Sequence, residues 1–218
     1  NFKFIAKQNK RRLYTLVDDK VQTKALAWQY GINTPRLIGT INYQHEVDRL
    51  PLLVKDWPSF VIKPAHGSGG KGVLVIKSHD GETFVTPSGR SLTYKEIYQH
   101  ISNTLSGLYS LGGQYDTAVI EEMVNFSHIF DSYSYQGIPD VRIIVYKGYP
   151  VMAMTRLATA ASGGRANLHQ GAVGVGLDIK TGKMLKAVMR NMPITHHPDT
   201  NADLSKIEVP FWREHLLI

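Results

Sequence analysis

The chain has 218 residues, 43% of them hydrophobic and 20% charged, and a chain of this length buries roughly 70% of its unfolded surface in one large domain or two small ones. It contains no cysteine, which excludes disulfides, thiol catalysis and cysteine-bound zinc. Its 25 Lys and Arg residues against 18 Asp and Glu give a net charge of +7, which attracts polyanions such as nucleotides, RNA or acidic peptides without choosing among them.

The first half of the chain predicts helices and strands in alternation. In chain order these are a helix at 19–31, a strand at 36–41, a helix at 43–54, and two strands at 60–62 and 73–76. In the first helix, Val21, Ala25 and Leu26 recur at helical spacing, and Gly31 ends the helix. The last two strands form a hairpin around a glycine-rich loop.

The second half of the chain predicts one long helix followed mainly by strands. The helix begins at Thr93, which can form a capping box with Glu96, and it ends at Gly112 and Gly113. Its apolar stripe consists of Ile97, Ile101, Leu105 and Leu108. A strand at 118–124 and a hairpin of 140–146 with 151–155 follow. This order predicts an α+β protein of two lobes, with a ligand cleft between them.

The segment FVIKPAHGSGGKGV, residues 60–73, is the strongest functional signal. Its loop is rich in glycine and has Lys63 and Lys71 near its ends, so backbone N–H groups and two cations can close over a phosphate. A mobile hairpin with incidental lysines is the alternative interpretation, because short glycine-rich motifs are common false positives. The loop leads into a strand, which excludes a Walker A loop and a Rossmann dinucleotide motif, since both lead into a helix.

Several segments together resemble an ATP-grasp ligase. They are VDDKVQTKALAWQYGINTP, the glycine-rich hairpin, VIEEMV as an adenine hinge, DVRIIVYKG and GRANLHQG, in family order over nearly the whole chain. The resemblance is greatest to the alpha-L-glutamate ligase-like branch. It implies two lobes of antiparallel sheet with packed helices and a nucleotide cleft between the lobes. The implied organisation is a lead-in at 1–18, an N-terminal lobe at 19–117 and an apparently incomplete C-terminal lobe at 118–218.

The resemblance implies an ATP-dependent carboxylate–amine ligase, in which ATP phosphorylates a carboxylate and an amine attacks the acyl phosphate to form an amide or peptide bond. Glutamate ligation is one candidate reaction. The implied partners are ATP and small-molecule or peptide carboxylate and amine substrates. The nucleotide-binding residues carried over are Lys20, Lys63, Gly67, Ser68, Gly69, Gly70, Lys71, Gly72, Glu121, Glu122, Met123, Val124 and, in place of the usual acidic ribose contact, His128.

Four residues are candidates for contacting the reacting groups: Arg156, Arg142, Asn167 and Arg165. Arg156 matches a basic family position that faces the transferred phosphoryl group, where a guanidinium stabilises spread charge. Arg142 lies two residues after Asp140 on one strand face, so a structural ion pair is the alternative. A surface loop is the alternative for residues 162–171, but Arg165, Asn167 and His169 alternate and would point the same way in an extended segment.

The family's magnesium ligands, an aspartate followed by Glu-x-Asn, have no counterpart after Asn167. We therefore assign no metal ligand within the chain and expect the Mg²⁺ ligands beyond Ile218, as in a truncated ligase that is inactive by itself. A non-catalytic nucleotide-binding fragment or pseudoenzyme is the alternative. RNA binding through the +7 charge and eleven tyrosines is a third, less favoured hypothesis. No apolar run approaches the roughly 18 residues of a membrane span, and we expect a cytoplasmic protein.

Overall fold

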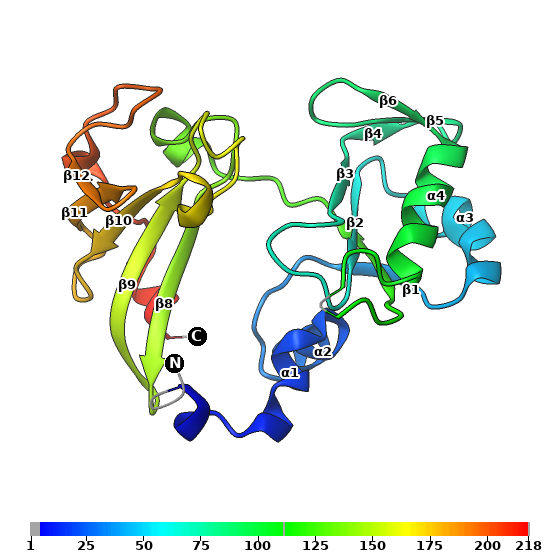
Figure 1. Cartoon of the computed structure of the whole chain (residues 1–218), viewed down its shortest axis with the longest axis horizontal. Helices are drawn as coiled ribbons and strands as arrows, with labels where there is room; N and C mark the ends of the chain where they lie inside the picture. The colour runs from blue at the N-terminus through cyan, green and yellow to red at the C-terminus, as the bar shows by residue number, and fades with distance from the viewer. Residues whose placement is uncertain (1–4, 111, 218) are drawn as a thin grey trace. The chain divides into compact units, whose positions relative to one another are not determined.

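The computed structural model describes residues 5–110 and 112–217. The chain divides into two compact units between Val124 and Asn125. In Figure 1 the first unit runs from blue to green and combines helices with sheet, whereas the second runs from green to red and is mainly β-structure. This composition confirms an α+β fold. Among the described residues, no helix has the length and apolar character needed to cross a membrane.

The first unit contains a four-stranded sheet of order β1-β7-β2-β3 and a three-stranded sheet of order β4-β5-β6. All of its strand pairs are antiparallel. Its elements are η2 (Arg11–Leu13), α1 (Thr15–Asp18), α2 (Lys20–Gln29), β1 (Leu37–Ile41), η3 (Gln44–Arg49), α3 (Leu50–Val54), β2 (Phe60–Pro64), β3 (Leu74–Ile76), β4 (Ser78–His79), β5 (Thr83–Val85), β6 (Ser91–Thr93), α4 (Tyr94–Leu105) and β7 (Ala118–Glu122).

The glycine-rich segment forms the predicted hairpin. In the antiparallel pair of β2 and β3, Phe60 lies opposite Ile76 and Ile62 lies opposite Leu74. β7 pairs with β2 on its other side and therefore belongs to the sheet of the first unit. Residues 118–124, which the sequence analysis places in the C-terminal lobe, thus lie with the first unit because β7 is central in its sheet.

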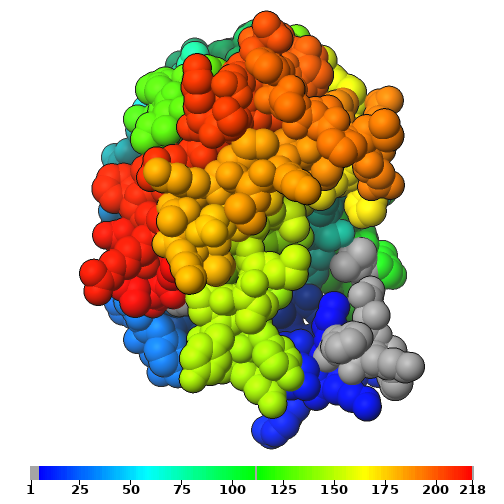
Figure 2. Space-filling view, turned by 90° about the vertical axis from the view of Figure 1, so that its left-hand side faces the viewer, coloured from blue at the N-terminus to red at the C-terminus, as the bar shows by residue number. Residues whose placement is uncertain are grey.

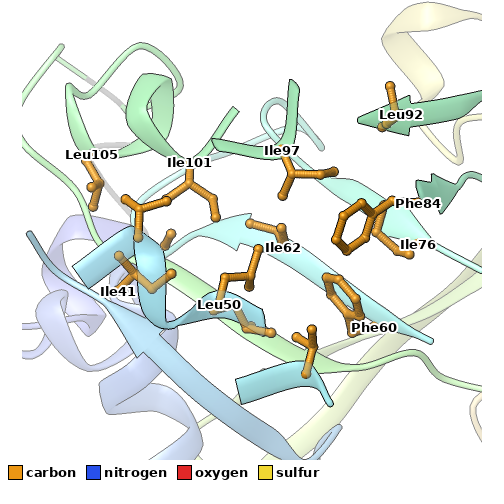
Figure 3. Packing of buried hydrophobic residues seen from close by; sticks show 14 residues of the cluster. Ile41, Leu50, Phe60, Ile62, Ile76, Phe84, Leu92, Ile97, Ile101 and Leu105 are labelled. Carbon is orange, nitrogen blue, oxygen red and sulfur yellow. The ribbon is translucent and has the colours of Figure 1, made fainter. Parts of the chain in front are cut away.

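The core of the first unit covers one face of its four-stranded sheet. Phe60 and Ile62 of β2 are fully buried against Ile97 and Ile101 of α4 (Figure 3). Because successive side chains of a strand point to opposite faces, Lys63 projects from the face that does not meet α4. The apolar stripe of α4 thus fixes which side of β2 presents the lysine.

Helix α4 begins as predicted and ends earlier than predicted. Its capping box is present, with the Thr93 N–H donating to Glu96 at 2.8 Å. The helix ends at Leu105 rather than at Gly112, because Gly107 adopts a left-handed conformation with φ +83°. Leu108, expected in the stripe, is 66% exposed.

Helix α2 has the predicted position, but its predicted apolar stripe is not buried. Asp19 caps its N-terminus, and its side chain accepts a hydrogen bond from the Val21 N–H at 2.8 Å. Ala27 is its buried residue, whereas Trp28 is 85% exposed. The helix is therefore held at its N-terminal end, where Lys20 meets the glycine-rich loop.

The second unit is an antiparallel meander of order β12-β11-β10-β9-β8. The predicted β8–β9 hairpin is confirmed, with Lys147 and Gly148 at positive φ in a two-residue turn. Its elements are η4 (His128–Tyr133), β8 (Asp140–Tyr146), β9 (Tyr149–Leu157), η5 (Leu168–Gln170), β10 (Val173–Leu177), β11 (Met184–Met189), β12 (Met192–Ile194), η6 (Leu204–Lys206) and α5 (Trp212–Leu216).

One face of this meander carries the second core. Leu157, Val173 and Val175 are fully buried there, and Trp212 of α5 packs against the same cluster. Figure 2 shows the surface formed by β11 and β12 (orange) and by the C-terminal residues (red), with the β8–β9 hairpin (yellow-green) below them. The opposite sheet face presents Arg142, Met154 and Lys186 around a shallow cavity of about 340 Å³.

Candidate functional site

A buried carboxylate contacts two lysines on the sheet face opposite α4. Glu121 of β7, whose side chain is 6% exposed, forms ion pairs with Lys63 of β2 and with Lys24 of α2, the latter at 2.7 Å. Glu121 pairs with Val61 across the two strands, so it lies diagonally next to Lys63 on the same face. Glu121 thus acts as the counter-ion of Lys63 in this state of the protein.

Lys20 reaches the start of the glycine-rich loop from the first turn of α2. Its Nζ donates to the carbonyl oxygens of Ala65 at 2.9 Å and Gly67 at 2.8 Å. Burial lowers the pKa of Lys20, and the nearby charge of Lys63 lowers it further, against the opposing effects of Asp116 and Glu121. The structure therefore brings Lys20 and Lys63 close enough for their charges to interact, although each ammonium has its own acceptors.

The glycine-rich loop is attached to the rest of the unit at both ends. At its start, Gly67 forms a β-bridge with Ser110. At its end, His100 Nε2 lies 3.0 Å from the Gly72 carbonyl oxygen, and a Cβ on Gly72 would lie 2.5 Å from the ring of Tyr109. Between these points, residues 68–71 are exposed.

The exposed part of the loop turns at two glycines. Gly69 and Gly70 have φ values of +63° and +76°, a conformation that glycine adopts at little cost. The Lys71 N–H closes the turn onto the Ser68 carbonyl at 3.2 Å. A cavity of about 480 Å³ adjoins this loop and is lined by Val17, Asp18, Lys20, His66, Gly67, Ser68, Ser110, Gln114 and Tyr115.

Asp116 is a site residue that the sequence analysis missed. Its side chain is fully buried and accepts hydrogen bonds from the backbone N–H and the ring of His66 and from Ser110. Burial alone would raise the pKa of Asp116, but the hydrogen bonds from Ser110, His66 and Thr117 outweigh it, and the pKa is lowered. The signal in the sequence is weak: an isolated acidic residue just before an apolar strand.

The predicted adenine hinge lies where β7 ends. Glu122 is the last residue of the strand, and its side chain accepts a hydrogen bond from the Arg36 N–H at 2.8 Å. Met123 and Val124 follow outside the strand, and Val124 is 39% exposed. The backbone groups of Met123 and Val124 therefore lie beyond the last hydrogen-bonded pair of β7, within three residues of Glu121 in sequence.

In the second unit, Asp140 pairs with Arg156 and not with Arg142. The two residues lie directly opposite each other in β8 and β9, and Arg156 Nε donates to Asp140 Oδ1 at 2.7 Å while Nη2 contacts Oδ2. This hydrogen bond raises the pKa of Arg156. The alternative of an Asp140–Arg142 ion pair is therefore wrong, because the register of the hairpin places Arg156 directly opposite Asp140.

Arg165, Asn167 and His169 do not lie on an extended segment with their side chains on one side, as the sequence predicted. Asn167 accepts a hydrogen bond from the His169 N–H at 3.1 Å and begins η5, so the segment is a turn and a short helix rather than an extended strand. Arg165 precedes this turn. His128, proposed for the ribose, lies 2.6 Å from Asp131 in an exposed pair.

Within residues 5–110 and 112–217, no group of three His, Asp or Glu residues could hold a metal ion. A family model described as sugar-transfer associated ATP-grasp matches residues 1–218. No curated protein matches the chain. The family match extends over both units described above.

Proposed function

Because the chain belongs to the sugar-transfer associated ATP-grasp family, we propose that it is an ATP-dependent carboxylate–amine ligase that forms an amide or peptide bond through an acyl phosphate. Membership of the ATP-grasp superfamily implies an ATP-dependent, ligase-like activity, and its members bind ATP and Mg²⁺ in general. The assignment to the glutamate ligase-like branch, with an amino acid as the amine substrate, is part of this proposal.

The convergence of Lys20, Lys63 and the glycine-rich loop is the observation that supports the proposal. A lysine 4 Å from a phosphate gains about 4 kcal/mol at an effective dielectric of about 20, before the cost of desolvation. One such contact cannot hold a triphosphate in water, whereas two lysines and the amides of residues 68–70 together can. Glu121 accepts from Lys63 and backbone carbonyls accept from Lys20, so phosphates bound by these ammonium groups would compete with those acceptors.

The proposal also assigns roles to further residues of each unit. Met123 and Val124 supply backbone groups for the adenine edge, and His128 contacts the ribose. Arg156 uses two of its donors on Asp140 and keeps the others for a phosphoryl or carboxylate oxygen. Arg142, Arg165 and Asn167 contribute to the substrate side. The described residues do not fit a magnesium site, so no role is assigned to the metal here.

Nucleotide binding is the first test of this proposal. We expect MgATP to stabilise the protein against heat, and Lys63→Met to weaken ATP binding about 10- to 100-fold by removing a charged hydrogen bond. Lys77→Met is the matched control, because Lys77 is exposed on the same unit. Equal ATP affinities for the two variants would contradict the role of Lys63.

The second test concerns the reaction. An acyl phosphate is trapped by hydroxylamine as a hydroxamate, so a panel of carboxylic acids with ATP and hydroxylamine reveals whether a carboxylate is activated. Hydroxamate formation that depends on both ATP and the acid supports the ligase. ATP binding without any hydroxamate, over a panel that includes acidic amino acids and peptides, would favour a non-catalytic nucleotide-binding protein.

A further inference from the structure

Asp116 forms a hydrogen-bond network that neither the sequence motif nor the proposed reaction uses. Its carboxylate has no exposed surface, and it accepts from the His66 N–H at 3.1 Å, from the Thr117 N–H at 2.7 Å and from the Ser110 hydroxyl. A buried carboxylate costs several kcal/mol unless such donors surround it. These donors therefore hold a charged carboxylate directly beside the glycine-rich loop.

The network fixes the orientation of the His66 imidazole. Nδ1 of His66 lies 2.8 Å from Asp116 Oδ1, and an ionised carboxylate can only accept, so Nδ1 carries the proton. Nε2 is left for another partner. The side chain is 46% exposed and lines the 480 Å³ cavity together with Lys20 and Ser68. An imidazole held from behind by a buried carboxylate thus faces the same cavity as a lysine of the candidate phosphate site.

The charged groups around this imidazole are already largely engaged. Asp116 is enclosed by its donors, and Asp19 Oδ2, 3.9 Å from His66 Nε2, belongs to the carboxylate that caps α2. The remaining ionisable groups of the cavity lining are Asp18, Lys20 and Tyr115. Donors therefore face the cavity from Lys20, Ser68 and, when protonated, His66 Nε2.

We propose that His66 Nε2 binds the phosphate chain of the nucleotide and that Asp116 is its positioning residue. The inference rests on the proposed function, since it takes ATP as the ligand of the loop. Asp116 holds the main chain of His66 as well as its ring, so it sets the place where the loop begins. A phosphate oxygen is the ligand, and the source is either the terminal phosphate of the nucleotide or inorganic phosphate.

Proton uptake during binding is the readout that a merely structural role would not change. A phosphate partner favours the protonated form of an imidazole, so a phosphate held at Nε2 brings a proton with it. Calorimetric titration of ATP at pH 7 in two buffers of different ionisation enthalpy measures this uptake. The wild-type protein should take up more protons than His66→Gln, and the comparison cancels the nucleotide's own proton linkage. His45→Gln, an exposed histidine of the same unit, should behave as wild type.

Affinity provides the second readout. His66→Ala should bind ATP about tenfold more weakly than wild type, whereas His45→Gln should bind ATP as wild type does. Asp116→Asn should take up fewer protons than wild type when it binds ATP, and circular dichroism checks that this variant is folded. Titrations with ADP and with inorganic phosphate identify the source, because a contact with the terminal phosphate loses its His66 dependence in ADP.

The outcomes separate this inference from the proposed function. If the wild-type protein binds no ATP, the proposed function fails and the inference fails with it. If ATP binds and His66→Gln matches wild type in both proton uptake and affinity, the inference alone is overturned. If inorganic phosphate alone shows the His66-dependent uptake, the contact belongs to free phosphate rather than to the nucleotide.

Discussion

Replacing Glu121 by glutamine should destabilise the first unit markedly more than the same change at the neighbouring Glu122. The carboxylate is 6% exposed and serves two ammonium groups, those of Lys24 and Lys63, whose side chains are 10% and 19% exposed. Glutamine has nearly the same shape, so packing is preserved. It keeps one acceptor oxygen, but it turns an NH₂ donor toward one of the ammonium groups and removes the negative charge.

The magnitude follows from this loss of charge. Removing one partner of a buried ion pair costs about 3–5 kcal/mol, because the other charge is left without compensation. Water still reaches Lys63 and, to a smaller extent, Lys24, and it compensates in part. We therefore expect Glu121→Gln to lower the free energy of unfolding by about 2–4 kcal/mol.

Urea unfolding, combined with hydrogen exchange of the β2 and β7 amides, measures this effect in the first unit. Glu122→Gln is the matched control: it lies next in the strand, and its amide oxygen still accepts from the Arg36 N–H, so a loss below about 1 kcal/mol is expected. In the double variant Lys24→Met with Glu121→Gln, the two effects should not add. A loss below 1 kcal/mol for Glu121→Gln, or strict additivity, would refute the idea that Glu121 neutralises both lysines.

Three further predictions concern the first unit. Thr93→Ala removes the capping box with Glu96 and should lower stability by about 1 kcal/mol, measured by urea unfolding, whereas Thr93→Ser should retain most of it. Gly72→Ala places a Cβ 2.5 Å from the Tyr109 ring at a φ of +73°, so it should reduce both stability and the thermal shift given by MgATP; an unchanged shift would contradict a rigid loop end. The lowered pKa of Asp116 stabilises the fold at pH values above the ordinary aspartate value, and this stability should disappear as the pH falls through about 4 and below, a loss that Asp116→Asn should lack in acid titrations followed by circular dichroism.

Local signals in the sequence located β1, β2, β3, β7 and the β8–β9 hairpin, but not β4–β6 or β10–β12. The β2–β3 hairpin, the cap of α4 and the two-residue turn of the β8–β9 hairpin depend on neighbouring residues, and the structure has all three. The end of α4 depends on Gly107, whose left-handed conformation is followed by a turn toward a distant segment. Helical spacing continues past that glycine to Leu108, so periodicity alone could not locate the end.

The candidate site shows the same division. Lys63 and the glycine loop are contiguous in sequence, so their proximity was predictable. Asp116 receives its hydrogen bonds from His66, which is 50 residues away, and no spacing rule connects them. Likewise, the choice of Arg156 over Arg142 as the partner of Asp140 depends on strand register, which brings together residues 16 positions apart. Contacts between residues far apart in sequence depend on the tertiary structure, and sequence patterns could not predict them.

The attachment of the glycine-rich loop at both ends limits the conformational entropy that ligand binding must remove. Fixing the backbone of one residue costs roughly 1–2 kcal/mol at room temperature. If the whole segment from Ala65 to Gly72 were free, its ordering would cost about 8–16 kcal/mol, which would consume most of the affinity of a nucleotide. Because the bridge at Gly67 and the hydrogen bond at Gly72 already hold the ends, at most the stretch from Ser68 to Lys71 has to be ordered, at no more than about 4–8 kcal/mol. The loop thus remains free enough to admit a ligand and is restricted enough to bind it tightly.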